Sequence, residues 1–133
     1  MASVGFTGTQ TGMNETQLIQ LRRLLRRLKR EGYTDFHHGA CIGADEQAHD
    51  VAKSLGYRLV VHPPDNTAKL AFGIRGGIWR SPAPYLTRNH HIVDESEVLI
   101  AAPRSVSEVQ RSGTWATVRY ARKAGKTIYM LER

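Results

Sequence analysis

The chain has 133 residues, 19 Lys and Arg against 12 Asp and Glu, a formal net charge of +7, 41% hydrophobic residues and a single cysteine. This length is near the commonest domain size, so we expect one domain over residues 1–133. Cys41 alone excludes an internal disulfide, no apolar run approaches the ~20 residues that cross a bilayer, and no signal peptide precedes the first strand-like segment. We therefore expect a cytoplasmic protein without membrane association, bound metal or other cofactor.

The first predicted elements are a buried strand and an amphipathic helix. The apolar run at 4–7 ends in a glycine and predicts the strand. Asn14 with Gln17 three residues later forms the pattern of a capping box, so the helix should begin near Glu15 and continue to about Arg30.

This helix has leucines at helical spacing and a strongly basic outer face. The basic residues are Arg22, Arg23, Arg26, Arg27, Lys29 and Arg30. Such a face is either a solvated surface that aids solubility or a footprint for nucleic acid, and charge alone does not separate the two. No aromatic residues that could stack on bases are interleaved with the arginines.

The middle of the chain continues the alternation of strands and helices. Residues 35–38 predict a second strand, 44–55 an alanine-rich helix, and 57–62 a β-branched strand that ends at two prolines. A short helical piece is expected over 67–72. The glycine- and proline-rich stretch 73–84 then predicts a long loop, which either closes over a ligand or is an idle surface insertion.

The last third predicts two more helices and two more strands. The expected elements are a helix over 85–95, an apolar strand over 98–102, a helix over 113–124 and a final strand over 127–131. Regular alternation of this kind predicts an α/β fold, a single Rossmann-like doubly wound parallel sheet with helices on both faces.

Ligands of such sheets bind beyond the carboxyl ends of the strands. Three glycine-rich turns follow predicted strands and precede predicted helices, so they should gather at this edge. They contain Gly8, Thr9, Gln10, Thr11 and Gly12, then Gly39 and Gly43, and finally Ser112, Gly113 and Thr114. Backbone N–H groups at helix N-termini favour phosphate or carboxylate, so the three turns predict an anion site.

Several motifs together resemble one superfamily. They are His38-Gly39-Ala40-Cys41-Ile42-Gly43-Ala44-Asp45, Arg88-Asn89 before the apolar strand at 98–102, and Ser112-Gly113-Thr114 with Ala121 and Gly125-Lys126. In this order they resemble the SLOG superfamily, whose Rossmann-like domains include DprA, the LOG phosphoribohydrolases and many bacterial and phage proteins. The YspA-like, or YAcAr, branch is the most similar. The resemblance runs from about Gly5 to Leu131.

The resemblance implies that a nucleotide or a nucleotide-derived ligand binds at the glycine-rich edge. The turns at 8–12 and 112–114 would hold a phosphate together with Arg88, Asn89 and Arg111. Asp45 would face the ribose, and Asp45 or Glu46 would be the acid or base of a catalysed reaction. The catalytic Glu of LOG enzymes is replaced by Thr117, which puts LOG chemistry in doubt.

Alternatives remain open at this level. The chain could hydrolyse the N-glycosidic bond of a nucleotide, or bind nucleic acid through its basic first helix, and related domains often pair as dimers. Arg88 could instead form a surface salt bridge, and the role of Asp45 could be limited to complementing the dipole of a helix. His38 or His62 could act as a base in the cleft, although the histidines lack the usual spacings of metal ligands.

Overall fold

The computed structural model describes residues 2–105, 107–108 and 112–133, and its centre is a six-stranded sheet. The strand order is β4-β3-β2-β1-β5-β6, and every neighbouring pair is parallel. The chain therefore begins in the middle of the sheet and winds outward in both directions. The strands are β1 (Ala2–Gly8), β2 (Tyr33–His38), β3 (Arg58–Val61), β4 (Ile78–Trp79), β5 (Val98–Ala102) and β6 (Thr127–Met130).

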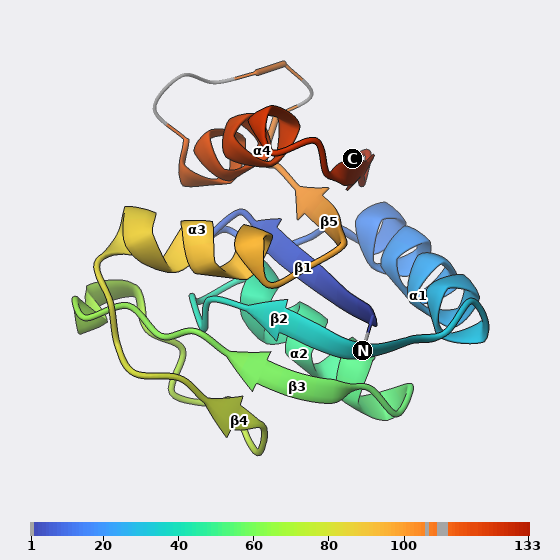
Figure 1. Ribbon diagram of the computed structural model, residues 1–133, viewed down its shortest axis with the longest axis horizontal. Coiled ribbons are helices and arrows are strands. Elements are labelled where there is room, and N and C mark those ends of the chain that lie inside the picture. Colours follow the sequence, from blue (N-terminus) through green and yellow to red (C-terminus); the bar gives the residue numbers. More distant parts are fainter. Residues whose placement is uncertain (1, 106, 109–111) are drawn as a thin grey trace.

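Helices cover both faces of the sheet, as Figure 1 shows. Helices α1 (Glu15–Arg30) and α2 (Ala44–Ser54) pack on one face, and α3 (Tyr85–Asp94) and α4 (Gly113–Lys123) pack on the other. A 3-10 turn, η1 (Thr67–Lys69), follows β3. The predicted doubly wound Rossmann-like α/β fold is confirmed.

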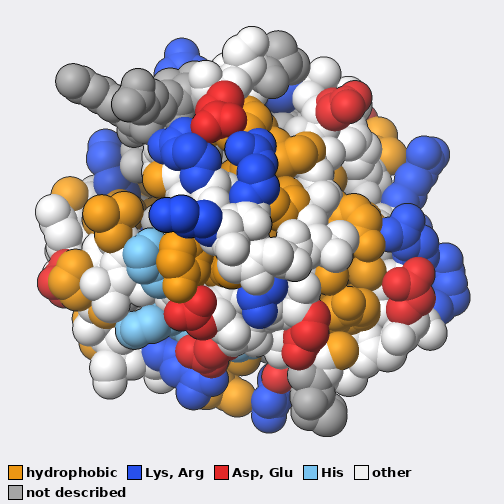
Figure 2. Space-filling model, turned by 45° about the horizontal axis from the view of Figure 1, so that its top comes forward, with side chains coloured by type: hydrophobic (Ala, Val, Ile, Leu, Met, Phe, Trp, Pro, Cys, Tyr) orange, Lys and Arg blue, Asp and Glu red, His pale blue; other side chains and the backbone are white. Residues whose placement is uncertain are grey.

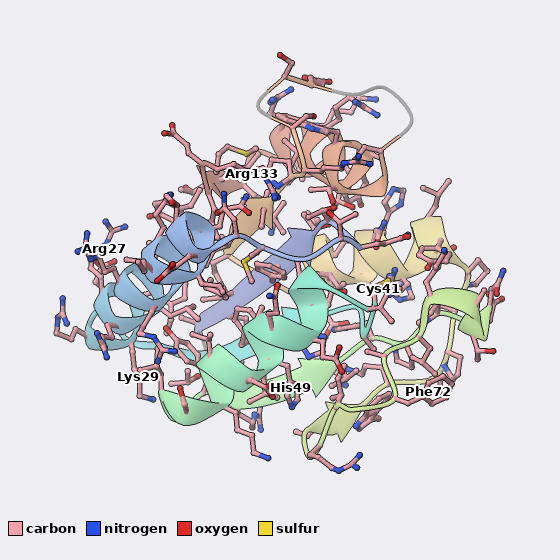
Figure 3. All side chains as sticks on the ribbon, turned by 180° about the vertical axis from the view of Figure 1, so that it is seen from behind. Arg27, Lys29, Cys41, His49, Phe72 and Arg133 are labelled. Carbon is pink, nitrogen blue, oxygen red and sulfur yellow. The ribbon has the colours of Figure 1, made fainter. Side chains whose placement is uncertain are left out.

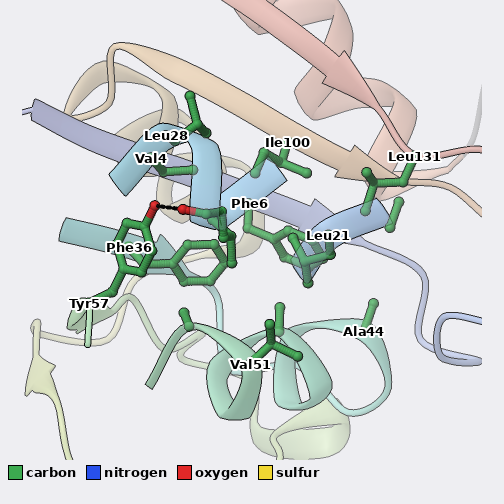
Figure 4. Close-up of a cluster of buried hydrophobic side chains, with 14 of the residues drawn as sticks. Val4, Phe6, Leu21, Leu28, Phe36, Ala44, Val51, Tyr57, Ile100 and Leu131 are labelled. Carbon is green, nitrogen blue, oxygen red and sulfur yellow. Dashed lines mark hydrogen bonds between the residues drawn. The ribbon is translucent and has the colours of Figure 1, made fainter. Parts of the chain in front are cut away.

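The two sides of β1 show why each face packs as it does. Val4 and Phe6 point into the apolar cluster beneath α1 and α2, which Figure 4 shows in close-up. Gly5 lies on the other side, where a Cβ would come within 2.8 Å of Ser96 Oγ and 3.2 Å of Ile92 Cγ2. Glycine at this position therefore lets α3 lie close against the central strand.

The capping box predicted at the start of α1 is present. Asn14 accepts a hydrogen bond from the backbone N–H of Gln17, and the Gln17 side chain accepts one from the backbone N–H of Asn14. Gln17 is fully buried, and its Nε2 also donates to the carbonyls of Pro103 and Leu131. One side chain thus ties the first turn of α1 to the chain just beyond β5 and β6.

The segment 73–84 is mostly irregular, as the sequence predicts, but it also contains pairing that the sequence did not predict. Within it, β4 adds a short parallel strand to the outer edge of β3, and Ala83 forms an isolated bridge with Pro64. A two-residue edge strand has no periodic pattern of its own, so only its pairing with β3 defines it. Among the described residues, no helix is long and apolar enough to cross a membrane.

Candidate functional site

A cleft of about 600 Å³ opens at the carboxyl edge of the sheet, where the strand order reverses between β1 and β5. This is the position at which open α/β sheets bind ligands. Most of the predicted site residues line it: Gly8, Thr9, Gln10, Thr11, Gly39, Asp45, Arg88, Asn89, Ser112, Gly113 and Thr114. The sequence therefore predicted that these residues gather at one edge of the sheet, and the structure brings them together there.

Three of the described site residues that the sequence predicts stand apart from this lining, and a fourth predicted residue is not described. Gly12, Gly43 and Glu46 are described but do not contribute to it, and Arg111 lies outside the described residues. Glu46 instead faces the chain after η1, since a Cβ at Gly73 would lie 2.6 Å from Glu46 Oε2. The segment 73–84, all of which the structure describes, contributes nothing to the lining, so a lid over the ligand is not seen there.

Gly43 and Gly8 allow the turns before α1 and α2 to pack directly against each other. Gly43 has a φ of +86°, and a Cβ on it would lie 2.8 Å from the carbonyl oxygen of Thr9. That carbonyl accepts the backbone N–H of Ala44 at 3.0 Å. A Cβ on Gly8 would press against the Ala44 side chain. These positions need glycine because the turns before α1 and α2 are in direct contact.

The turn between β2 and α2 uses its own backbone donors. Asp45 Oδ2 accepts the N–H groups of Gly39 at 3.2 Å and Cys41 at 3.1 Å. The N–H of Ala40, whose φ of 59° lies in the left-handed region, goes to His38 Nδ1 at 3.0 Å. Three successive donors are therefore taken by side chains, and this turn does not offer them to a phosphate.

Asp45 itself is almost completely buried at the edge of the cleft. Burial raises the pKa of its carboxyl group to about 6, although the Arg88 charge and the two backbone hydrogen bonds act in the opposite direction. Its second oxygen, Oδ1, is buried and has no hydrogen-bond partner among the described residues. One oxygen thus shapes the turn, and the other remains unpaired.

The N-termini of the helices differ in what they present to the cleft. At α1 the capping box takes the N–H groups of Asn14 and Gln17, and at α2 the N–H of Ala44 is donated to the Thr9 carbonyl. At α4, Ser112 is the N-cap and accepts the N–H of Trp115 at 3.3 Å, while no described residue accepts the N–H groups of Gly113 or Thr114. The first residues of α4, Gly113 and Thr114, line the cleft, whereas no residue of the first turn of α1 does.

Arg88 is not a surface ion pair, because it is only 3% exposed. Its Nη1 donates to the carbonyls of Gly39 and of His62, the latter at 3.1 Å. Its Nε donates to Asn89 Oδ1 at 2.8 Å, and Nη2 lies 3.5 Å from Cys41 Sγ. Most of its donors therefore hold the ends of β2 and β3 against α3, and a bidentate grip on phosphate is not formed by Arg88 in this arrangement.

Sequence reasoning missed Arg104 and Tyr85, which both line the cleft. Arg104 is exposed two residues beyond β5 and belongs to none of the ion pairs found among the described residues. A basic residue directly after a central parallel strand was a usable signal. Tyr85 begins α3, and its ring lies under the guanidinium of Arg88 at 4.8 Å from centroid to Cζ. Burial raises the pKa of Tyr85 to about 12, so its hydroxyl stays protonated.

Trp115 also lines the cleft, and it belongs to the apolar cluster beneath α3 and α4. It is 6% exposed, and its indole N–H is buried without an acceptor among the described residues. The part of the chain that the structure describes contains two buried side-chain polar atoms without a partner, Trp115 Nε1 and Asp45 Oδ1. Both belong to residues that line the cleft.

The buried histidines form two hydrogen-bonded pairs away from the cleft lining. His38 Nε2 lies 2.8 Å from His49 Nδ1, and His37 Nδ1 lies 2.8 Å from His62 Nε2. Burial keeps the pKa of His38 well below its ordinary value and lowers that of His62 to about 3. Neither His38 nor His62 contributes to the lining, so the structure does not place them as bases in the cleft.

The basic face of α1 lies apart from the cleft. Figure 3 shows Arg27 projecting from α1 at one side of the molecule, with Cys41 of the cleft at the other. Arg27 forms an exposed ion pair with Glu31 at 3.4 Å. On the face shown in Figure 2, basic and acidic side chains are interspersed, so no continuous positive surface leads across it.

Comparisons with known proteins support the fold. No family profile matches the chain, and no curated protein matches it in sequence. Among solved structures, the molybdenum cofactor binding protein of the phototrophic bacterium Rippkaea orientalis is 23% identical with a TM-score of 0.72, over 97% of this chain and 75% of that one. The molybdenum cofactor carrier protein of Chlamydomonas reinhardtii is 22% identical with a TM-score of 0.67, over 98% and 75%.

DNA processing protein A of Helicobacter pylori has the same fold. It is 18% identical with a TM-score of 0.72, and the match covers 99% of this chain and 66% of that one. That structure is described for its mode of binding single-stranded DNA. At these identities the similarity establishes the fold.

Proposed function

We propose that this chain, whose fold is that of the SLOG superfamily, binds a nucleotide or a nucleotide-derived ligand in the cleft between β1 and β5. The observation that carries the proposal is the N-terminus of α4, where the donors of Gly113 and Thr114 open onto the cleft beside Arg104. Free N–H groups, the positive end of a helix dipole and a guanidinium together favour a phosphate group.

The two unpaired polar atoms indicate a second part of the ligand. A buried polar group without a partner costs about 1–3 kcal/mol, and a ligand group that pairs with it removes this cost. Asp45 Oδ1 offers an acceptor and Trp115 Nε1 a donor. A ligand with hydroxyls or ring nitrogens, such as a ribose or a base, carries both complementary groups.

The similar proteins support a ligand at this fold without defining which one. One is described as binding the molybdenum cofactor and another as binding single-stranded DNA. The test therefore uses thermal unfolding with nucleoside mono- and diphosphates, ADP-ribose, NAD, inorganic phosphate, the molybdenum cofactor and a single-stranded oligonucleotide. Binding to the folded state raises the melting temperature with dose.

Gly113→Val is the main variant for this test. A Cβ at Gly113 meets no atom within 4 Å, so the folded chain accommodates it, while the branched side chain enters the space beside the free N–H groups. We expect nucleotide affinity to fall at least about tenfold, or about 1.4 kcal/mol. Thr16→Val is the matched control, because it places valine in the first turn of α1, no residue of which lines the cleft. Equal affinity in both variants would contradict the proposal.

Arg104→Ala and Arg22→Ala distinguish binding of a small ligand in the cleft from binding of nucleic acid at α1. Arg104 lines the cleft, whereas Arg22 lies on the exposed face of α1. If the cleft holds a nucleotide, only Arg104→Ala weakens binding. A loss confined to Arg22→Ala, with an affinity for oligonucleotides that falls steeply as salt rises, would replace this proposal by nucleic-acid binding at α1.

A second candidate, hydrolysis of a nucleotide N-glycosidic bond, is favoured by Asp45. Its unpaired oxygen and its raised pKa suit a general base. In this reaction the Asp45 carboxylate takes a proton from water, and the oxygen of that water attacks C1′ of the ribose. The nucleobase then leaves with the electrons of the N-glycosidic bond. Thr117 is buried and its hydroxyl donates to the Gly113 carbonyl at 2.9 Å, so it does not act in place of a glutamate. The test is release of free base, which Asp45→Asn should abolish. Undiminished release in that variant would exclude the mechanism.

A further inference from the structure

A group of metal-ligand side chains lies outside the cleft, on the α3 side of the sheet. His37 is in β2, His62 directly follows β3, and Glu95 directly follows α3. One ligand atom from each lies within 4.8 Å of the other two. None of the three lines the cleft, so this group is separate from the nucleotide proposal.

The His38–His49 pair shows what a purely structural pair looks like in this protein. His38 Nδ1 accepts the N–H of Ala40, so His38 donates from Nε2 to His49 Nδ1. His49 Nε2 then donates to the carbonyl of Arg75 at 2.7 Å. All four ring nitrogens are engaged, and both tautomers are fixed.

The His37–His62 pair is not completed in this way. His37 Nδ1 and His62 Nε2 face each other at 2.8 Å, and no hydrogen bond among the described residues engages the opposite nitrogen of either ring. No outside partner therefore fixes the tautomers, so both rings can carry their proton on the far nitrogen. The two facing nitrogens then both present lone pairs, which is what a metal ion requires.

We propose that His37, His62 and Glu95 bind a divalent transition-metal ion of the zinc, cobalt or nickel class. Two imidazoles and a carboxylate are a donor set that such ions favour over Mg²⁺ or Ca²⁺. Zn–N bonds of about 2.1 Å place tetrahedral ligand atoms about 3.4 Å apart, so the histidines must separate slightly and the Glu95 carboxylate must close in. Because the ligands come from three elements, the ion fastens the end of α3 to β2 and β3.

The surroundings favour metal binding by the two histidines and oppose metal binding by the Glu95 carboxylate. Both imidazole rings are buried, His37 at 3% and His62 at 2% exposure, so the packing around them holds the two facing nitrogens in place. Arg80 Nη2, however, donates to Glu95 Oε1 at 2.7 Å in a half-exposed ion pair. Metal binding must compete with this guanidinium. His91 lies one helical turn before Glu95 and is exposed, so it can reach the open side of the site.

The test is a titration of tag-free, chelator-treated protein with Co²⁺, followed by displacement with Zn²⁺. We expect one ion per chain and the visible absorption of a low-coordinate cobalt complex. Glu95→Gln should weaken binding at least about tenfold, because the loss of a mere hydrogen-bond partner of a metal ligand already costs about 10- to 100-fold in affinity. Arg80→Gln should strengthen it up to about fivefold, because it removes the competing charge of a half-exposed ion pair.

Glu31→Gln is the matched control, since Glu31 is also an exposed, ion-paired carboxylate but has no histidine pair beside it. It should leave the cobalt titration unchanged. His62→Gln is a second ligand variant, and its fold is checked by circular dichroism because His62 is buried. Cobalt binding that is equal in wild type, Glu95→Gln and Glu31→Gln would overturn the proposal, as would unchanged binding in a folded His62→Gln variant.

Discussion

Helices α1 and α2 cover one face of the sheet with leucine, valine and alanine side chains, whereas α3 and α4 cover the other with a smaller apolar cluster and several buried polar groups. The first layer contains the phenylalanines of β1 and β2 and the leucines of α1. The second contains Arg88, the His37–His62 pair and one side of the cleft, whose other side comes from Asp45 of α2 and the turns before α1 and α2. The first layer is the larger apolar core, and the second leaves more polar groups at its buried surface.

The largest expected effect on stability comes from truncating a leucine in the layer formed by α1 and α2. Leu25 is fully buried in the cluster of α1 and α2, so Leu25→Ala should lower the free energy of unfolding by about 3–4 kcal/mol through lost burial and a residual cavity. Denaturant unfolding measures this. Leu24→Ala is the control, because Leu24 is only partly buried against the same cluster and should cost clearly less. A similar loss in both variants would show that the cluster is not tightly packed.

Asp45 tests whether a polar group in the cleft wall reduces stability. Its pKa is raised from 3.8 to about 6 in the folded protein, so the folded state holds a proton that the unfolded state has released. This contribution is fully present below about pH 4 and is lost as the pH rises through about 6. Relative to Asp45→Asn, the wild type should lose about 2–3 kcal/mol of unfolding free energy between about pH 4 and pH 7.

The measurement is denaturant unfolding of both proteins across this pH range. The side chain introduced by Asp45→Asn can keep the backbone hydrogen bonds of the turn through its amide oxygen but does not titrate. Parallel stability curves for the two proteins would show that the carboxyl group has an ordinary pKa and is better hydrated than its burial implies.

Gly5→Ala tests how closely the second layer approaches the sheet. The added Cβ would lie 2.8 Å from Ser96 Oγ, and overpacking of this kind costs about 1–2 kcal/mol. Gly5→Ala combined with Ser96→Ala should recover part of the loss, because the nearest atom is then absent. Thermal unfolding of the single and double variants decides the point, and a single variant as stable as wild type would mean that α3 shifts freely.

The smallest expected change in stability comes from removing the N-cap side chains of α1 and α4. Asn14→Ala and Ser112→Ala should each cost about 1 kcal/mol of unfolding free energy, because each removes a side-chain acceptor from a helix start. Only Ser112→Ala should also lower the affinity for the nucleotide in a binding titration, since the first residues of α4 line the cleft and those of α1 do not. An equal effect of the two variants on binding would remove the distinction between the two N-termini.

Most helices and strands could be predicted because their signals are local. The capping box at Asn14 and the leucine spacing place α1 within the bounds that the structure gives, and the apolar run of β5 is recognised at once. The short strand β4 could not be predicted, because two exposed residues carry no periodic pattern and depend on pairing with β3. The edge of the cleft was predictable from the alternation of elements, since parallel strands share one carboxyl edge.

The availability of donors within the cleft was not predictable. The sequence offered three glycine turns as equivalent anion sites, yet Asp45 closes one of them and the Thr9 carbonyl occupies the start of α2. The adjacent histidines did not show the sequence spacing of metal ligands, because each pairs with a residue far away in the chain. His37 contacts His62 after the neighbouring strand, and His38 contacts His49 on a helix. Periodicity and turn residues fix the order of elements through local conformational energies, and the sequence alone determined these. The partner of each polar group comes from a distant part of the chain, so only the tertiary structure decided which groups remain free for a ligand.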